Sequence, residues 1–229
     1  MTFSHSDPTV PALVSLSADW AVFYKPFGAL SEEKEGDLSA PALLREILTE
    51  KKAPFASVYP VHRLDRTTAG LMVFALTKKG AALLSAAVVS GEVRKIYTAY
   101  LTAAEDLPER GELRDRLFFD RRRDKAFAVS PETDRRGAKE AVLRYELGER
   151  FDWRGHAVTE ARVELLTGRT HQIRAQFAAR KSPLLGDGKY GSRANFKGPA
   201  LFSSELSFPW DGKTETFVCP AVRPGAREE

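Results

Sequence analysis

Residues 62–71 read His62-Arg63-Leu64-Asp65-Arg66-Thr67-Thr68-Ala69-Gly70-Leu71. Short apolar runs at Val58–Val61 and Leu71–Leu76 predict strands on either side, so Asp65 is expected in the loop between them. Its two arginine neighbours are expected to keep the carboxylate ionised at neutral pH. An ionised carboxylate can act as a nucleophile or as a base. From these residues alone, the commoner alternative is a structural Asp–Arg pair that ties the loop.

A second polar cluster occurs at residues 165–174, which read Leu165-Leu166-Thr167-Gly168-Arg169-Thr170-His171-Gln172-Ile173-Arg174. Gly168 permits a tight turn after a strand, and Thr170 is predicted to cap a helix over Thr170–Arg180. Cationic side chains and free amide donors at this helix start suit a phosphate or a carboxylate. The alternative is an ordinary capped helix with exposed arginines. His171 has no partner at zinc-ligand spacing, which argues against a metal site.

A third segment reads Arg94-Lys95-Ile96-Tyr97-Thr98-Ala99-Tyr100 and lies in a predicted strand over Val93–Leu101. Alternation places Lys95, Tyr97 and Ala99 on one face of that strand. An aromatic ring beside cations can stack on a nucleic-acid base while the cations meet phosphate. The alternative is a half-buried strand tyrosine, which is the commoner case.

Basic residues are concentrated in one part of the chain, whose formal net charge is +4. Nine of them are Arg114, Arg116, Arg121, Arg122, Arg123, Lys125, Arg135, Arg136 and Lys139. Such clustering is typical of a surface that faces phosphate groups. A solvated hairpin tip explains the charge equally well. Arg121, Arg122 and Arg123 are the candidate RNA-binding residues of this stretch.

The periodicity of the chain predicts an α+β fold, with a mixed, mostly antiparallel sheet and flanking helices. Besides Thr170–Arg180, helices are expected at Pro41–Glu50, capped by Ser39, and from Thr77 to Ser90. The tail is expected to alternate turns with short strands at residues 200–202, 207–208 and 216–218. We expect a single domain over residues 1–229, with its core between about residues 12 and 220 and with mobile termini.

The composition restricts the compartment and the class of protein. One cysteine, Cys219, excludes an internal disulfide framework and fits a reducing compartment. No stretch reaches the apolar length of a membrane span, and no basic segment followed by an apolar one opens the chain. We therefore expect a cytoplasmic protein without a membrane partner. Because no heptad pattern or exposed apolar helix is evident, we expect a monomer with no obligate protein partner.

Taken together, the three segments resemble the motifs of the RluA-type pseudouridine synthase family. The residues at 62–71 match its His-Arg-Leu-Asp-Arg motif, Lys95-Ile96-Tyr97 matches Lys-x-Tyr, and Thr167–Arg174 matches its late motif. Two shorter pieces agree, Lys25-Pro26-Phe27-Gly28 and Gly186-Asp187-Gly188-Lys189-Tyr190-Gly191. The pieces follow family order over nearly the whole chain.

The resemblance implies a fold, a reaction and a set of site residues. The fold is a largely antiparallel mixed sheet with an RNA cleft, and the reaction converts uridine in ribosomal or transfer RNA to pseudouridine without a cofactor or a metal. Asp65 would be the nucleophile, Arg174 the basic partner of its carboxylate, and Tyr97 the ring that stacks on the flipped base. Arg63 would fill the space that the base leaves, and Ile173 would form an apolar wall. Further substrate contacts would come from Arg66, Lys95, Arg169 and His171.

The chain departs from the family pattern in two places. The family's histidines are missing both after the late motif and after Lys-Pro-x-Gly, and the stretch Ser31–Gly36 is acidic. The chain is also expected to be too short at its start for the small RNA-binding domain that many relatives carry. Substrate choice would then depend on the catalytic domain, including its arginine-rich loops.

Two other functions compete with this interpretation. A non-catalytic RNA-binding or RNA-chaperone protein explains the charge, but it does not explain an aspartate, which repels phosphate, between Arg63 and Arg66. A metal-dependent nuclease needs several acidic residues that converge on a cation. Only Asp65 and Asp187 are loop aspartates in motif-like contexts, and an assay with EDTA separates the two reactions.

Overall fold

The computed structural model describes residues 1–3, 7–130, 133 and 135–225 of the chain. It divides into two units, the first made of Met1–Lys95 and Phe202–Val222 and the second of Ile96–Leu201 and Arg223–Glu229. The chain passes from one unit to the other within β5 (Arg94–Thr102) and returns within β10 (Leu201–Trp210). Residues 4–6 and 226–229, on which the expectation of mobile termini partly falls, lie outside the described residues.

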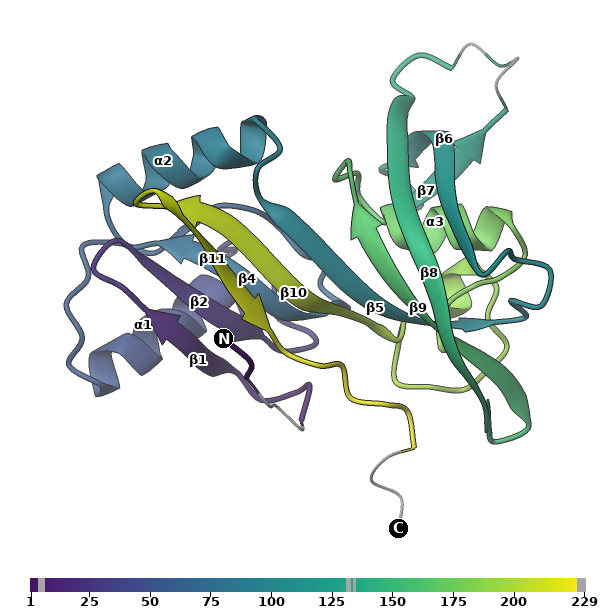
Figure 1. Ribbon diagram of the computed structural model, residues 1–229, viewed down its shortest axis with the longest axis horizontal. Helices are drawn as coiled ribbons and strands as arrows, with labels where there is room; N and C mark the ends of the chain where they lie inside the picture. Colours follow the sequence, from purple (N-terminus) through teal and green to yellow (C-terminus); the bar gives the residue numbers. More distant parts are fainter. Residues whose placement is uncertain (4–6, 131–132, 134, 226–229) are drawn as a thin grey trace. The chain divides into compact units, whose positions relative to one another are not determined.

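The first unit is built on a mixed sheet (Figure 1). Its strands, in sheet order, are β1 (Ala12–Leu16), β2 (Trp20–Lys25), β4 (Ala69–Ala75), β10 and β11 (Lys213–Val218), with the two-residue β3 (Tyr59–Pro60) also paired to β4. β10 runs parallel to β4, and the pairs β1–β2, β2–β4, β3–β4 and β10–β11 are antiparallel. Every residue of β2 and β4 is buried, which is why both read as nearly continuous apolar runs.

Two helices of the first unit begin where their capping residues predict. Ser39 accepts a hydrogen bond from the N–H of Ala42 at the start of α1 (Ala40–Glu50). Thr77 does the same for Gly80 at the start of α2 (Lys78–Val89), which packs against β4. In each case the side-chain oxygen satisfies a donor that the first helical turn leaves unpaired. Both predicted helices are therefore confirmed.

The prediction of separate short strands at residues 200–202 and 207–208 is wrong, because β10 is one continuous strand. Ser203 and Ser204 break the apolar pattern in the sequence, yet both are buried, and the Ser203 hydroxyl donates to the carbonyl of Leu71 at 3.0 Å. A Cβ at Gly70 (φ +122°) would lie 2.3 Å from the Ser203 carbonyl oxygen. Small residues thus let β4 and β10 approach closely at the end of the 62–71 segment.

The second unit has an antiparallel sheet in the order β5, β9 (His156–Leu165), β8 (Lys139–Trp153), β6 (Arg110–Asp120) and β7 (Lys125–Val129). The helix α3 (Gln172–Ala179) packs against β6 and β7 and against the short helix η1 (Gly188–Tyr190). Both units therefore combine sheet and helix, and the predicted α+β fold class is confirmed. Within the described residues, no helix is long and apolar enough to cross a membrane.

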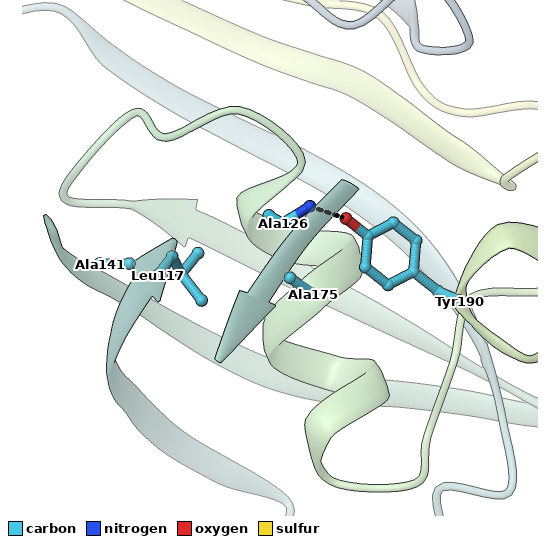
Figure 2. Close-up of a cluster of buried hydrophobic side chains, with 5 residues drawn as sticks. All are labelled: Leu117, Ala126, Ala141, Ala175 and Tyr190. Atoms are coloured by element: carbon cyan, nitrogen blue, oxygen red, sulfur yellow. Dashed lines mark hydrogen bonds between the residues drawn. The ribbon is translucent and has the colours of Figure 1, made fainter. Parts of the chain in front are cut away.

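A cluster of buried side chains joins α3 and η1 to this sheet (Figure 2). It contains Leu117 of β6, Ala126 of β7, Ala141 of β8, Ala175 of α3 and Tyr190 of η1. Three alanines let the backbones come close, and the tyrosine fills the remaining space. Because its hydroxyl accepts a hydrogen bond from the N–H of Ala126 at 2.8 Å, the ring of Tyr190 is fixed at its polar end as well.

Candidate active site

Asp65 lies in a turn of the first unit, between β3 and β4. The N–H of Thr68 donates to the carbonyl of Asp65 at 3.0 Å, which closes the turn. The hydroxyl of Ser31 holds the preceding residue, since it accepts from the N–H of Leu64 at 2.9 Å and donates to the Leu64 carbonyl at 2.7 Å. Leu64 is buried and Asp65 is half-buried. The loop is thus anchored beside the aspartate, whose side chain retains access to solvent.

Lys25 contacts the backbone of the same loop on the other side of Asp65, at Arg66. Its side chain is completely buried, and its ammonium group donates to the carbonyls of Ala29 at 2.8 Å, Pro26 at 3.1 Å and Arg66 at 3.4 Å. Burial lowers the pKa of Lys25 to about 7, and the carboxylate of Asp65 opposes that shift. Gly28 and Arg66 add two hydrogen bonds between these segments, from the Gly28 N–H to the Arg66 carbonyl and from the Arg66 Nε to the Gly28 carbonyl.

Arg63 and Arg66, the two neighbours of Asp65 in the motif, each have an acidic partner from a distant part of the sequence. Arg63 pairs with Glu32 at 3.4 Å, and Arg66 pairs with Asp37 at 3.2 Å. Both arginines are exposed, with 71% and 55% of their side-chain surface accessible. The acidic stretch that departs from the family pattern therefore supplies the partner of Arg63, and the residue directly after that stretch supplies the partner of Arg66.

His62 and Lys95, both in the first unit, have pKa values that burial lowers. His62 is buried, and its Nε2 accepts from the N–H of Val73 at 3.2 Å. Burial, with a smaller effect of the Lys95 charge, lowers the pKa of His62 to about 3, so the ring is neutral at physiological pH. Burial also lowers the pKa of the half-buried Lys95. Both groups therefore favour their neutral forms more than exposed groups do.

The late motif of the second unit forms a turn and the start of α3, but the predicted cap is wrong. α3 begins at Gln172 rather than Thr170, and the residue before it, His171, adopts the left-handed conformation (φ 55°) without a side-chain cap. The side chain of Gln172 instead accepts hydrogen bonds from the Arg169 N–H at 2.9 Å and from the Thr167 hydroxyl at 2.8 Å. The Gln172 side chain thus pairs with a backbone donor and a side-chain donor of the turn, the role that Thr170 was expected to take as the cap.

The candidate residues of this motif differ strongly in exposure. Arg169 is exposed, and its Nε donates to the Glu140 carbonyl at 2.8 Å. His171 and Ile173 are buried, and the His171 Nδ1 lies 3.1 Å from the hydroxyl of Tyr190. Arg174 is also buried and forms a two-point ion pair with Asp187, from Nε to Oδ2 at 2.7 Å and from Nη2 to Oδ1 at 2.8 Å.

Tyr97 lies in β5 opposite Val163 of β9, and only 5% of its surface is accessible. It is therefore more deeply buried than the half-buried strand tyrosine that the sequence offered as the alternative. A ring held in this way loses little conformational freedom when another flat ring stacks on it.

Arg121, Arg122 and Arg123 form the exposed tip of the hairpin between β6 and β7. Asp120 shapes this tip, since its Oδ1 accepts from the N–H groups of Arg122 and Arg123. Among the residues that the structure describes, neither Arg121 nor Arg122 has an ion pair, and Arg123 has only a long one to Asp120, at 3.8 Å. Elsewhere in the basic stretch, Glu112 and Glu140 hold Arg114. The tip therefore presents three neighbouring exposed guanidinium groups.

The structure places four of the candidate residues in the first unit, namely Arg63, Asp65, Arg66 and Lys95. The second unit holds Tyr97, Arg121, Arg122, Arg123, Arg169, His171, Ile173 and Arg174. Sequence reasoning did not assign roles to Ser31, Lys25 or Asp187, although the last two occur in the short Lys-Pro and Gly-Asp pieces. Lys25 and Asp187 could have been noticed in the sequence, because each is a charged residue close to glycines in a segment otherwise rich in buried residues.

Comparison with known proteins supports the resemblance that the motifs carry. The model of the family described as RNA pseudouridylate synthase matches residues 19–179. The ribosomal large subunit pseudouridine synthase D of Xanthomonas campestris pv. campestris is 38% identical over 137 residues, which cover 57% of this chain and 36% of that protein. The chloroplastic RNA pseudouridine synthase 2 of Oryza sativa subsp. japonica is 34% identical over 201 residues, which cover 76% of this chain and 44% of that protein. The chain spans less than half the length of these two relatives.

Solved structures agree on the fold. The human RNA pseudouridylate synthase domain containing 1 superposes with a TM-score of 0.77 at 22% identity, covering 93% of this chain and 84% of that one. The human RNA pseudouridylate synthase domain containing 4 gives a TM-score of 0.70 at 20% identity, covering 92% and 88%. The fold and the motifs agree, and the expected resemblance to RluA-type enzymes is confirmed. The chain belongs to the RNA pseudouridylate synthase family.

Proposed function

We propose that this protein isomerises specific uridines in RNA to pseudouridine, with Asp65 as the nucleophile. In this reaction the bond between C1′ of the ribose and N1 of the base breaks, the base turns, and C1′ bonds to C5. One proton leaves C5 and one is taken up at N1, so the product has the same atoms as the substrate. Family membership and the aspartate motif at residues 62–71 support the proposal.

The observation that carries the proposal is the way the loop holds Asp65. Ser31 fixes the residue before it, Lys25 and Gly28 fix the residue after it, and the carboxylate stays half-buried rather than enclosed. A nucleophile must be held in a reactive position while its reacting atom remains accessible. A purely structural aspartate has no need for both conditions.

The other motif residues take the roles that the family resemblance implies. Tyr97 stacks on the flipped base, Arg174 pairs with the catalytic carboxylate, and Ile173 forms the apolar wall of the base pocket. Arg63 occupies the space that the base leaves, and its high exposure suits a side chain that enters RNA. Arg66, Lys95, Arg169 and His171 contact the substrate, whose phosphates require cations.

The arginines at the β6–β7 tip are proposed to bind RNA outside the catalytic site. The support is their exposure, together with the weakness of the ion pairs that the described structure gives them. Free guanidinium groups on a hairpin can contact two or three phosphates without a fixed sequence preference. They would then contribute to the choice of target by adding affinity for a particular RNA shape.

Large-subunit ribosomal RNA is the favoured target, because several curated relatives are named for it. Transfer RNA is the alternative target. A cytoplasmic location belongs to the same proposal, since the single cysteine, Cys219, is a buried free thiol. We also propose that the protein works as a monomer.

The proposal is tested by mapping pseudouridine in total RNA from cells with and without the gene. Complementation with the wild-type chain should restore every lost position, and complementation with Asp65→Asn should restore none. The positions that return identify the RNA and the uridine directly. If deletion removes no pseudouridine from any RNA, the proposal is wrong.

A further inference from the structure

Arg174 is held by more than one neighbour in the second unit. Its side chain is 5% exposed and that of Asp187 is 1% exposed, so their two hydrogen bonds are shielded from water. A guanidinium that donates from two nitrogens to both oxygens of one carboxylate is fixed in plane and in direction. One contact to a single oxygen would leave it free to rotate.

Tyr190 restrains the same guanidinium from a second direction. The centre of the Arg174 guanidinium lies 4.9 Å from the centroid of the tyrosine ring, within the range of a cation–π contact. The ring is itself fixed, because its hydroxyl accepts from the Ala126 N–H (Figure 2). The same hydroxyl lies 3.1 Å from the His171 Nδ1. Asp187 therefore sets the direction of Arg174, and Tyr190 limits its tilt.

The backbone that carries Asp187 is equally constrained. The Asp187 N–H donates to the Leu184 carbonyl at 3.0 Å, while the Asp187 carbonyl accepts from Tyr190 at 2.9 Å and from Ser192 at 3.1 Å. A Cβ on the preceding Gly186, which has φ +76°, would lie 2.3 Å from the Gly198 carbonyl oxygen. The turn can form only with glycine at that position, and it presents Asp187 in one place.

We propose that Asp187 is a positioning residue for the isomerisation, which acts by holding Arg174 in the orientation that the reaction requires. This inference rests on the proposed function, in which Arg174 pairs with the catalytic carboxylate. Asp187 uses the Nε and Nη2 of Arg174, so the direction of Nη1 is set by this pair. Loss of the Asp187 charge would weaken the two hydrogen bonds that set this direction, while the contact with the Tyr190 ring would remain.

The test is the Asp187→Asn variant, which keeps the size of the side chain and removes its charge. Turnover at saturating RNA should fall roughly tenfold to a hundredfold, while the KM for RNA changes by less than about threefold. Asp187→Glu restores the charge on a longer arm and should recover part of the loss. The matched control is Asp115→Asn, which breaks the ion pair with Arg180, the residue that directly follows α3, and should leave turnover within about twofold.

A double-variant comparison separates this role from simple support of the fold. If Asp187 acts through Arg174, Asp187→Asn should cost no further turnover in an Arg174→Ala background. Additive losses would show that Asp187 acts independently of Arg174, and the inference would be wrong. If Asp187→Asn fails to fold, as judged by circular dichroism, Asp187→Ser, which also lacks the charge, carries the test, and wild-type turnover in that variant would overturn the inference.

The two proposals fail in different ways. Full turnover of Arg174→Ala would remove Arg174 from the proposed catalytic site, whatever Asp187 does. A large loss in Arg174→Ala with wild-type turnover in a folded Asp187→Asn variant would leave the proposed function intact and reject only the positioning role.

Discussion

The hydroxyl of Ser31 pairs with both backbone groups of Leu64, as acceptor from its N–H and as donor to its carbonyl. The two residues are separated by 33 positions in the chain, and Leu64 immediately precedes Asp65. One side chain thereby takes the place of a neighbouring strand at this point of the loop. The backbone next to the aspartate is thus held by a residue from the acidic segment, outside the aspartate motif.

Ser31→Ala should therefore reduce both stability and turnover. The Leu64 N–H is left without its partner in a buried place, which is expected to lower the free energy of unfolding by about 1–3 kcal/mol. Turnover at saturating RNA should fall several-fold, measured at a temperature where the variant is folded. Ser182→Ala is the control, because it removes a buried hydroxyl that donates to the Ala103 and Arg180 carbonyls in the second unit. Equal turnover in the two variants would show that Ser31 stabilises the fold without positioning Asp65.

His62 should make the protein less stable as the pH falls below neutral. Its pKa is lowered from 6.5 to about 3 in the folded protein, so between these values the unfolded chain binds a proton that the folded chain does not. This contribution to stability is complete above pH 6.5 and declines by about 1.4 kcal/mol for each pH unit below it. Urea unfolding of wild type and His62→Gln between pH 7 and pH 4 measures the difference in slope. Parallel pH dependence of the two proteins would contradict the burial of a neutral histidine.

The hairpin tip should control RNA affinity more than chemistry. Replacement of Arg121, Arg122 and Arg123 by alanine should weaken binding to total RNA and flatten its dependence on salt by up to about three phosphate contacts. Turnover at saturating RNA should change little. The matched control replaces three exposed arginines that already have glutamate partners, Arg110, Arg144 and Arg223. Equal losses in both triple variants would mean that only net charge matters, and a large drop in saturated turnover would show that the tip shapes the site.

The parts of the fold that the sequence predicted well are those with local signals. The capping oxygens of Ser39 and Thr77 mark the starts of α1 and α2, and Gly168 in the late motif marks a turn before a helix. The predictions were wrong where contacts in the folded chain differed from those that the local sequence suggested. Gln172 took over the role expected of Thr170, and buried serines hid the continuity of β10.

In the candidate site, too, the local features were predictable and the contacts between distant residues were not. The loop position of Asp65 was predictable because the motif lies between two apolar runs. The partners of its neighbours were not, since Glu32 and Asp37 reach Arg63 and Arg66 across about thirty residues of sequence. The pairing of Arg174 with Asp187 was equally hidden, although both residues occur in recognised pieces of the chain. Sequence motifs identify such residues, but only folding shows which of them meet.

The central claim is that Asp65 is the nucleophile, and Asp65→Asn tests it most directly. The measurement is release of tritium from C5 of uridine in labelled total RNA prepared from cells that lack the gene, alongside binding of the same RNA. Asparagine has nearly the same shape but no negative charge, so turnover should fall by at least about a thousandfold while RNA affinity stays within about threefold. Tritium release by a folded Asp65→Asn variant at a rate near that of the wild type would contradict the account.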